Sequence, residues 1–177
     1  MVAALSVGRP KYADYAAVHA SAGAAGKALT GRLLGLADED SAAYAVFAAA
    51  LKMPKETDAE QAARKAALRA AARTAAEVPL ACIEACHEVV LAAESLAGRS
   101  NLNASSDLAV ACLLASAAAQ GAGANVLVNL PAVGDDAFAA AMRDRVVGLL
   151  GEIDAISATT RAIVASGELR PVAAGAG

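Results

Sequence analysis

Aromatic residues are scarce in this chain of 177 residues, which has three Tyr, two Phe and no Trp although hydrophobic types make up 58% of it. Most of the hydrophobic residues are alanine, which is the best helix former but buries little area in a core. Strand-forming residues dominate no window, and no Asn-Gly or Asp-Gly hairpin signal separates alternating runs. We therefore expect one all-α domain with closely packed helices, whose core a partner subunit could complete.

An excess of positive charge is also absent. The formal net charge is −3, from 15 basic and 18 acidic residues. Nucleic-acid-binding domains are usually strongly basic. The few aromatic residues are not interleaved with Arg or Lys, so a platform for stacking bases is missing as well. We expect no nucleic-acid partner.

Signals for export and membrane insertion are missing too. Residues 1–5 lack the positive leader and the long apolar core of a signal peptide. The apolar run 108–120 is shorter than a helix that crosses a bilayer. Cys82, Cys86 and Cys112 lie in apolar helical patterns, which is typical of buried thiols in a reducing compartment. These features predict a cytoplasmic protein without a membrane partner.

Motifs for metal binding and nucleophilic catalysis are not found. The spacing of Cys82, Cys86 and His87 does not match haem attachment, and no second ligand pair exists for zinc. Neither His19 nor His87 adjoins a nucleophile in a strained turn. No glycine-rich phosphate loop follows a strand. We expect no metal site.

Proline, glycine and capping residues mark the first predicted helices. Pro10 suits the start of a helix that runs to about residue 37. Four glycines inside it are expected to let neighbouring backbones approach closely: Gly23, Gly26, Gly31 and Gly35. The acidic and capping residues 38–41 are expected to start a second helix, which carries Tyr44, Phe47 and Leu51 on one face.

A capping box over residues 57–60 predicts the start of a long helix. Pro79 lies inside the helical pattern, so we expect a kink or a break there. The pattern resumes after Pro79 and stops at Gly98.

Two further helices are expected in the second half of the chain. The first runs from the capping residues 105–107 towards Leu130, and residues 131–134 form a turn. The last helix starts at residues 135–136 and ends near Ser166. Residues 169–177 have the composition of a disordered tail.

Polar residues interrupt the apolar helices at four places, namely Lys11-Tyr12, Asp38 with Asp40, the segment 101–107, and Asn125 with Asn129. Each place has a structural explanation beside a functional one. The four structural explanations are an exposed helix start, an N-cap pair, a loop with a cap, and hydrogen bonds to a neighbouring helix. Buried amides need partners, which a neighbouring helix or a ligand could supply to the two asparagines.

Six short motifs occur in order along the chain: Gly8-Arg9-Pro10-Lys11-Tyr12, Asp40-x-x-x-Tyr44, Met53-Pro54-Lys55, Val78-Pro79-Leu80, Asn101-Leu102-Asn103-x-x-Ser106-Asp107, and Asn125-Val126-x-x-Asn129. Together they resemble the cyclodeaminase/cyclohydrolase family of folate enzymes. The resemblance covers residues 1 to about 166.

The resemblance implies a homodimeric, antiparallel, all-α bundle with a folate site in a groove at or near the subunit interface. Members of the family carry a further N-terminal helix after a Pro-Gly-Gly-Gly-Ser-like turn. Residues 1–5 resemble the end of that helix. We therefore expect residues 1–168 to form a cyclodeaminase/cyclohydrolase domain that lacks its first helix, followed by the tail 169–177.

The family chemistry concerns one carbon that bridges two folate nitrogens, and it needs a positioned acid/base but no metal or redox cofactor. The resemblance implies that Asp40 is this group, with Asp38 as the alternative. Lys11 and Tyr12 are implied to bind substrate or transfer protons. The other implied substrate-binding residues are Asn101, Asn103, Ser106, Asp107, Asn125 and Asn129, together with Arg9, Lys55 and Arg64 for the glutamate tail.

Three functions stay open. The first is a methenyltetrahydrofolate cyclohydrolase, which hydrolyses the methenyl to the formyl form. The second is a formiminotetrahydrofolate cyclodeaminase, which uses the same site and releases ammonia. The third is an inactive helical dimer that binds folate or serves a structural role.

Overall fold

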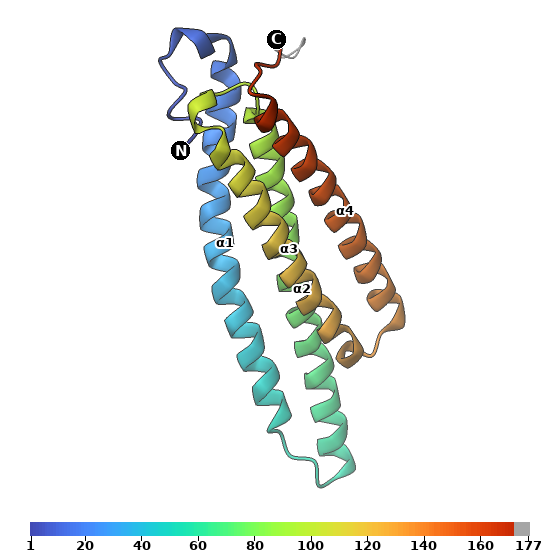
Figure 1. Cartoon of the computed structure of the whole chain (residues 1–177). Helices are drawn as coiled ribbons and strands as arrows, with labels where there is room; N and C mark the ends of the chain where they lie inside the picture. Colours follow the sequence, from blue (N-terminus) through green and yellow to red (C-terminus); the bar gives the residue numbers. More distant parts are fainter. Residues whose placement is uncertain (172–177) are drawn as a thin grey trace. The chain divides into compact units, whose positions relative to one another are not determined.

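The computed structural model describes residues 1–171 and is built from four long helices (Figure 1). They are α1 (Ala16–Leu51), α2 (Asp58–Leu96), α3 (Ser106–Val133) and α4 (Asp136–Ser166). Two short 3-10 helices, η1 (Pro10–Tyr15) and η2 (Leu102–Ala104), precede α1 and α3. No strand occurs within the described residues, so the all-α prediction is confirmed.

The chain divides into two compact units, and each of the four helices contributes to both. Unit 1 comprises Met1–Gly31, Cys86–Ala117 and Gly151–Gly177, and unit 2 comprises Arg32–Ala85 and Ala118–Leu150. The largest fully buried side chains of unit 1 are Val90, Cys112, Ile153 and Thr160. Those of unit 2 are Ile83, Val126, Val146, Leu130 and Leu149.

The helix α1 is continuous where the sequence predicts a new start at residues 38–41, so that prediction was wrong. The hydroxyl of Ser41 donates to the carbonyl oxygen of Ala37 at 3.0 Å, one turn back in the same helix, instead of capping a new one. Asp38 and Asp40 are exposed to solvent. Alanine-rich sequence on both sides favours the helix, and solvated carboxylates do not end it.

Within residues 1–171, no neighbouring segment packs closely against the glycines of α1. No described atom lies within 4 Å of the position that a Cβ would occupy at Gly23, Gly26, Gly31 or Gly35. Among the glycines inside the described helices, only Gly123 on α3 meets close neighbours of this kind, with a side-chain carbon of Val146 3.3 Å from the Cβ position. Within the described chain, the close packing expected at these glycines is therefore not found.

The helix α2 continues through Pro79, so the predicted break is wrong. Proline has no backbone N–H, and the carbonyl oxygen of Ala75 therefore lacks its helical donor. The side-chain Nδ2 of Asn129 on α3 donates to this oxygen at 2.9 Å. A side chain of another helix thus replaces the missing hydrogen bond.

The capping box at the start of α2 is confirmed. The hydroxyl of Thr57 accepts from the N–H of Glu60 at 3.2 Å, and Oε2 of Glu60 accepts from the N–H of Thr57 at 2.9 Å. The N–H groups of Thr57 and Glu56 both donate to the Glu60 carboxylate and lower the pKa of this carboxyl.

The boundary between α3 and α4 lies later than the sequence suggests. The helix α3 includes Pro131 and ends at Val133, where a turn is predicted. Gly134, at φ 67°, ends the helix. Oδ1 of Asp135 then accepts from the N–H of Phe138 at 3.0 Å, which confirms the predicted start of α4.

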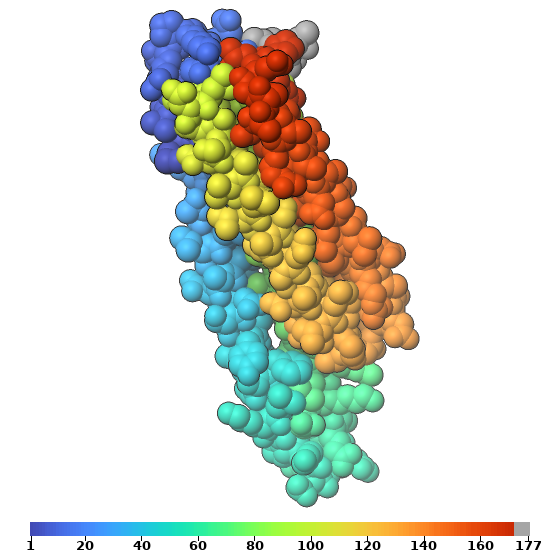
Figure 2. Space-filling view, in the orientation of Figure 1, coloured from blue at the N-terminus to red at the C-terminus, as the bar shows by residue number. Residues whose placement is uncertain are grey.

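The helix α3 carries apolar residues on two faces. One face is buried and repeats every three or four residues: Leu108, Cys112, Ala115, Ala119, Ala122, Val126, Leu130 and Val133. The other is exposed and has the same spacing: Val110, Leu114, Ala117, Gly121, Ala124 and Val128. In Figure 2, no segment covers the side of α3 that faces the viewer.

By length and composition alone, the segment Leu102–Val133 could cross a membrane, and it is the one such helix among the described residues. The prediction that the apolar run here is too short was therefore wrong about its length. A third of its most apolar window, 33%, is buried inside the chain. The inner face of α3 is thus a core face.

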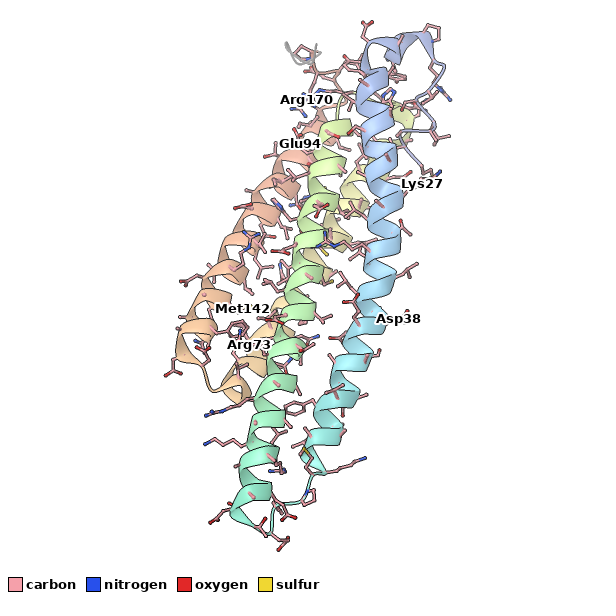
Figure 3. All side chains as sticks on the ribbon, turned by 180° about the vertical axis from the view of Figure 1, so that it is seen from behind. Lys27, Asp38, Arg73, Glu94, Met142 and Arg170 are labelled. Atoms are coloured by element: carbon pink, nitrogen blue, oxygen red, sulfur yellow. The ribbon has the colours of Figure 1, made fainter. Side chains whose placement is uncertain are left out.

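The chain after α4 is anchored within unit 1 as far as Arg170. The guanidinium of Arg170 pairs with Oε1 of Glu94 at 2.6 Å, and its carbonyl oxygen accepts from the hydroxyl of Tyr15 at 2.6 Å (Figure 3). The N–H of Arg170 donates to the carbonyl oxygen of Gly98 at 2.7 Å. Most of the predicted disordered tail, residues 172–177, lies outside the described residues.

Candidate functional site

The predicted site residues fall into two groups, one in each unit. Unit 1 holds Arg9, Lys11, Tyr12, Asn101, Asn103, Ser106 and Asp107. Unit 2 holds Asp40, Lys55, Asn125 and Asn129. The prediction that one groove contains both groups stays a prediction, and each group is described by itself.

Tyr12 is buried in unit 1, and its hydroxyl accepts a hydrogen bond from the N–H of Leu102 at 3.1 Å. The Nζ of Lys11 lies 5.7 Å from the centre of the Tyr12 ring. This distance is within the range of a cation–π contact. Lys11 itself is exposed, so its ammonium group is accessible to a ligand.

The segment around Asn101 is held by the N-terminal residues. The N–H of Asn101 donates to Oγ of Ser6 at 2.8 Å, and its side-chain Nδ2 donates to the carbonyl oxygen of Leu5 at 3.4 Å. Its Oδ1 accepts from the N–H of Asn103 at 3.2 Å. The amide of Asn101 is therefore occupied within the chain, whereas Asn103 is exposed.

Asp107 borders a pocket of about 890 Å³ in unit 1. His19 and Lys27 line the same pocket, and most of its other lining is alanine and glycine. The imidazole Nε2 of His19 is already bonded to the carbonyl oxygen of Arg99 at 2.8 Å. Asp107 and Ser106 stand exposed at the start of α3, where they are available to a ligand.

Arg9 lines a different pocket of unit 1, of about 420 Å³, together with Tyr12 and His19. Lys55 lies in unit 2. The structure therefore does not bring Arg9 and Lys55 into one pocket, although both are predicted to bind the glutamate tail.

Asp40 lies in the middle of α1 and is exposed. No described residue forms a hydrogen bond or an ion pair with its carboxylate. The carboxylate is therefore open to a substrate that approaches unit 2.

Asn129 is half-buried, and both hydrogens of its amide nitrogen are used. Its Nδ2 donates to the carbonyl oxygens of Ala75 and Asn125, each at 2.9 Å. Of the two alternatives left by the sequence, the structure provides the neighbouring helix. The side chain of Asn125 is exposed one turn earlier on α3.

Lys55 lines a pocket of about 670 Å³ in unit 2, formed by α1, the connection to α2, the start of α2 and the end of α3. Three further basic residues, Arg64, Lys65 and Arg69, line it as well. The guanidinium of Arg69 occupies the space beside Gly134, with Nε 2.7 Å from where a Cβ would lie. A side chain at position 134 would occupy the space that the Arg69 guanidinium fills, so this position of Arg69 requires a glycine there.

Sequence reasoning identified Lys55 and Arg64 but missed Lys65 and Arg69. The basic residues at 64, 65 and 69 fall on neighbouring turns of α2, which is a signal present in the sequence. Their common pocket depends on α3, whose position beside α2 the sequence does not reveal. Within residues 1–171, no group of three His, Cys, Asp or Glu side chains is placed to hold a metal ion.

Comparison with known proteins identifies the family. The model of the family described as formiminotransferase-cyclodeaminase matches residues 1–147. The chain belongs to this family.

Several relatives span most of this chain. It is 38% identical over 157 residues to the methenyltetrahydrofolate cyclohydrolase of Methylorubrum extorquens. This match covers 89% of this chain and 76% of the relative. It is 36% identical over 125 residues to the formimidoyltransferase-cyclodeaminase of Sus scrofa. This match covers 71% of this chain and 23% of the relative. The chain thus spans less than a quarter of this second relative.

The crystal structure of the formiminotetrahydrofolate cyclodeaminase from Thermotoga maritima is similar in fold. The TM-score is 0.82 at 25% identity, and the match covers 94% of this chain and 79% of that chain. The family expected from the six motifs is therefore confirmed, and the four-helix architecture is that of a cyclodeaminase.

Proposed function

We propose that this chain is a methenyltetrahydrofolate cyclohydrolase. The observation that supports this most directly is the 38% identity to a relative of that name over 89% of the chain. The formimidoyltransferase-cyclodeaminases of four animals match with 30–36% identity and over a smaller share of the chain. Cyclodeaminase activity is the alternative.

Asp40 is proposed as the general base. The oxygen of a water molecule bonds to the cationic methenyl carbon, and the carboxylate of Asp40 takes a proton from that water. The hydroxyl of the resulting tetrahedral carbon then loses its proton as one of the two carbon–nitrogen bonds breaks, and the departing nitrogen takes a proton, which leaves the formyl product and releases one proton overall. A negative carboxylate near the cation also stabilises it electrostatically. The reaction adds water without electron transfer, so we propose no redox cofactor and no metal.

We further propose that the protein is a homodimer with its folate site near the subunit interface. In α1, the buried positions are His19 and every seventh residue from Ala22 to Ala50. A helix that packs on several neighbours within one chain buries a wider stripe. The exposed apolar face of α3 is a second surface that a partner subunit would cover.

The test is a spectroscopic assay with each folate offered separately. The purified protein should remove the absorbance of methenyltetrahydrofolate faster than the uncatalysed hydrolysis. A protein that instead forms this absorbance from formiminotetrahydrofolate, with release of ammonia, is a cyclodeaminase. A protein that binds folate but catalyses neither reaction would favour the inactive dimer and contradict the proposal.

The role of Asp40 is tested with a matched pair of variants. Asp40→Asn keeps the shape but removes the base, and we expect at least a hundredfold loss of kcat, since a positioned general base contributes about 10²–10⁴-fold. Asp38→Asn removes an equally exposed carboxylate from the same helix and should keep activity. Loss in Asp38→Asn with retention in Asp40→Asn would transfer the assignment to Asp38.

A cytoplasmic location is a further proposal, which rests on three cysteines that are all present as thiols. Cell fractionation tests it, and recovery in the membrane or exported fraction would contradict it.

A further inference from the structure

Two segments of unit 1 carry exposed candidates for substrate binding. Lys11 is exposed on η1, and Asn103 and Asp107 are exposed on η2 and at the start of α3. The two segments are far apart in the sequence, and one hydrogen bond joins them, from the N–H of Leu102 to the hydroxyl of Tyr12 at 3.1 Å. A ligand that contacts both segments needs them at a fixed separation.

A third segment, residues 167–170, bonds to both of these segments and is called the C-terminal strap here. Gly167, at φ 67°, turns the chain away from the end of α4. The carbonyl oxygen of Arg170 accepts from the hydroxyl of Tyr15, the last residue of η1, at 2.6 Å. The N–H of Arg170 donates to the carbonyl oxygen of Gly98, in the connection from α2 to α3, at 2.7 Å. One residue of the strap therefore holds η1 and this connection together.

The connection has a close seat for the strap at Gly98. The residue has φ 67°, which favours glycine. A Cβ at this position would lie 2.9 Å from Cγ of Arg170 and 3.0 Å from the carbonyl oxygen of Glu168. Any side chain here would therefore displace the strap.

The side chain of Arg170 fixes the strap to the end of α2. Its Nη1 donates to Oε1 of Glu94 at 2.6 Å and to the carbonyl oxygens of Glu94 and Ala97 at 3.2 and 3.4 Å (Figure 3). The guanidinium thus also caps the last carbonyl groups of the helix. Both side chains of the ion pair are 29% exposed, so solvent screens this pair less than a fully exposed one.

We propose that Arg170 is a positioning residue for substrate binding, an inference that rests on the proposed function. Its ion pair with Glu94 fixes the strap, and the strap fixes η1 against the connection from α2 to α3. Lys11 and Asp107 are thereby kept at one separation. The bonds of the strap hold these binding residues and not the proposed base Asp40, so their loss should affect KM more than kcat.

The test is the steady-state hydrolysis of methenyltetrahydrofolate. In Arg170→Ala, KM should rise roughly tenfold, the effect of one lost charge-assisted contact, while kcat stays unchanged. A strap that only stabilised the fold would reduce the fraction of active protein, which lowers kcat and leaves KM unchanged. Arg170→Lys keeps a cation opposite Glu94 and should recover most of the wild-type KM.

The matched control is Arg161→Ala in the same unit. Arg161 is exposed, and its Nε donates to the carbonyl oxygen of Ser157 in its own helix, at 3.4 Å. This variant also removes an arginine near the end of the chain, but it leaves the strap intact. It should keep the wild-type KM.

The hydroxyl of Tyr15 provides a second way to break the same connection. Tyr15→Phe removes the donor to the carbonyl oxygen of Arg170 and should also raise KM. In Tyr15→Phe/Arg170→Ala, the rise should be clearly smaller than the product of the two single effects, because both changes release η1 from the strap. Single effects that multiply in full would show two independent roles and overturn the inference.

An unchanged KM in both Arg170→Ala and Tyr15→Phe, or a fall in kcat alone, would also overturn the inference and leave the proposed function intact. If the wild type turns over no folate, the proposed function fails, and calorimetry with tetrahydrofolate still decides the inference. Binding that is weaker in Arg170→Ala but not in Arg161→Ala supports it. Absence of binding, or equal binding by all three proteins, overturns it.

Discussion

The side-chain Nδ2 of Asn129 donates to the carbonyl oxygen of Ala75, the oxygen that Pro79 leaves without its helical donor. The bond is 2.9 Å long, and Ala75 is buried, so water could not easily replace it. Two of the short sequence motifs, Val78-Pro79-Leu80 and Asn125-x-x-x-Asn129, are therefore connected physically. The proline is tolerated inside α2 because an amide from α3 supplies the missing donor.

This connection predicts a strong coupling between the two residues. Asn129→Ala should lower the free energy of unfolding by about 1–3 kcal/mol, the cost of leaving a buried polar group unpaired. In a Pro79→Ala background the new backbone N–H satisfies Ala75, so the same change should cost clearly less. Urea unfolding of the four proteins in this double-mutant cycle measures the difference. Additive costs would contradict the connection, and Asn125→Ala, which removes an exposed side chain, is the control for stability.

The sequence predicts the helical class well because alanine favours helix at almost every position, whatever its neighbours. It predicts boundaries well only where the capping chemistry is reciprocal, as between Thr57 and Glu60. Residues 38–41 are acidic and hydroxyl-bearing, as the residues of a helix N-cap are, but here they lie in the middle of a continuous helix. No local signal distinguishes these two cases.

Contacts between segments that are distant in the sequence could not be predicted from it either. The partner of Asn129 depends on which helix lies beside α3, and the pocket of Lys55, Arg64, Lys65 and Arg69 is completed by the end of α3. Such neighbours are set by packing, which one sequence does not reveal. The choice of candidate residues from motifs was possible, but their division between two units was not.

Tyr12 is predicted to matter more for stability than for turnover. Its hydroxyl already accepts from the N–H of Leu102, so Tyr12→Phe should leave this N–H unpaired and cost about 1–3 kcal/mol of unfolding free energy. Urea unfolding and the cyclohydrolase assay should be run on the same samples. Tyr44→Phe is the control, because Tyr44 is 73% exposed. A large loss of kcat in Tyr12→Phe with unchanged stability would restore the catalytic role.

Cys112 is predicted to make the protein less stable at alkaline pH. Burial raises the pKa of its thiol above the ordinary value of 9.0. The unfolded chain therefore loses this proton at lower pH than the folded chain, and stability falls as pH rises through the unfolded towards the folded value. The thermal midpoint of the wild type should fall more between pH 7.5 and 9.5 than that of Cys112→Ala. Parallel pH curves for the two proteins would contradict this assignment.

The exposed apolar face of α3 is predicted to be the dimer contact. Leu114 and Val128 are 67% and 72% exposed and belong to one seam with alternating spacings of four and three residues. This repeat is typical of helices that pack side by side. The double variant Leu114→Glu/Val128→Glu should place charges in a buried contact and convert a wild-type dimer into a monomer, as measured by light scattering during gel filtration. Val147→Glu, at a residue 72% exposed on α4, is the matched control and should stay dimeric. A double variant that still dimerises would place the dimer contact on another face. A wild-type protein that is already monomeric would rule the dimer out. Circular dichroism of the double variant shows whether its helices are intact.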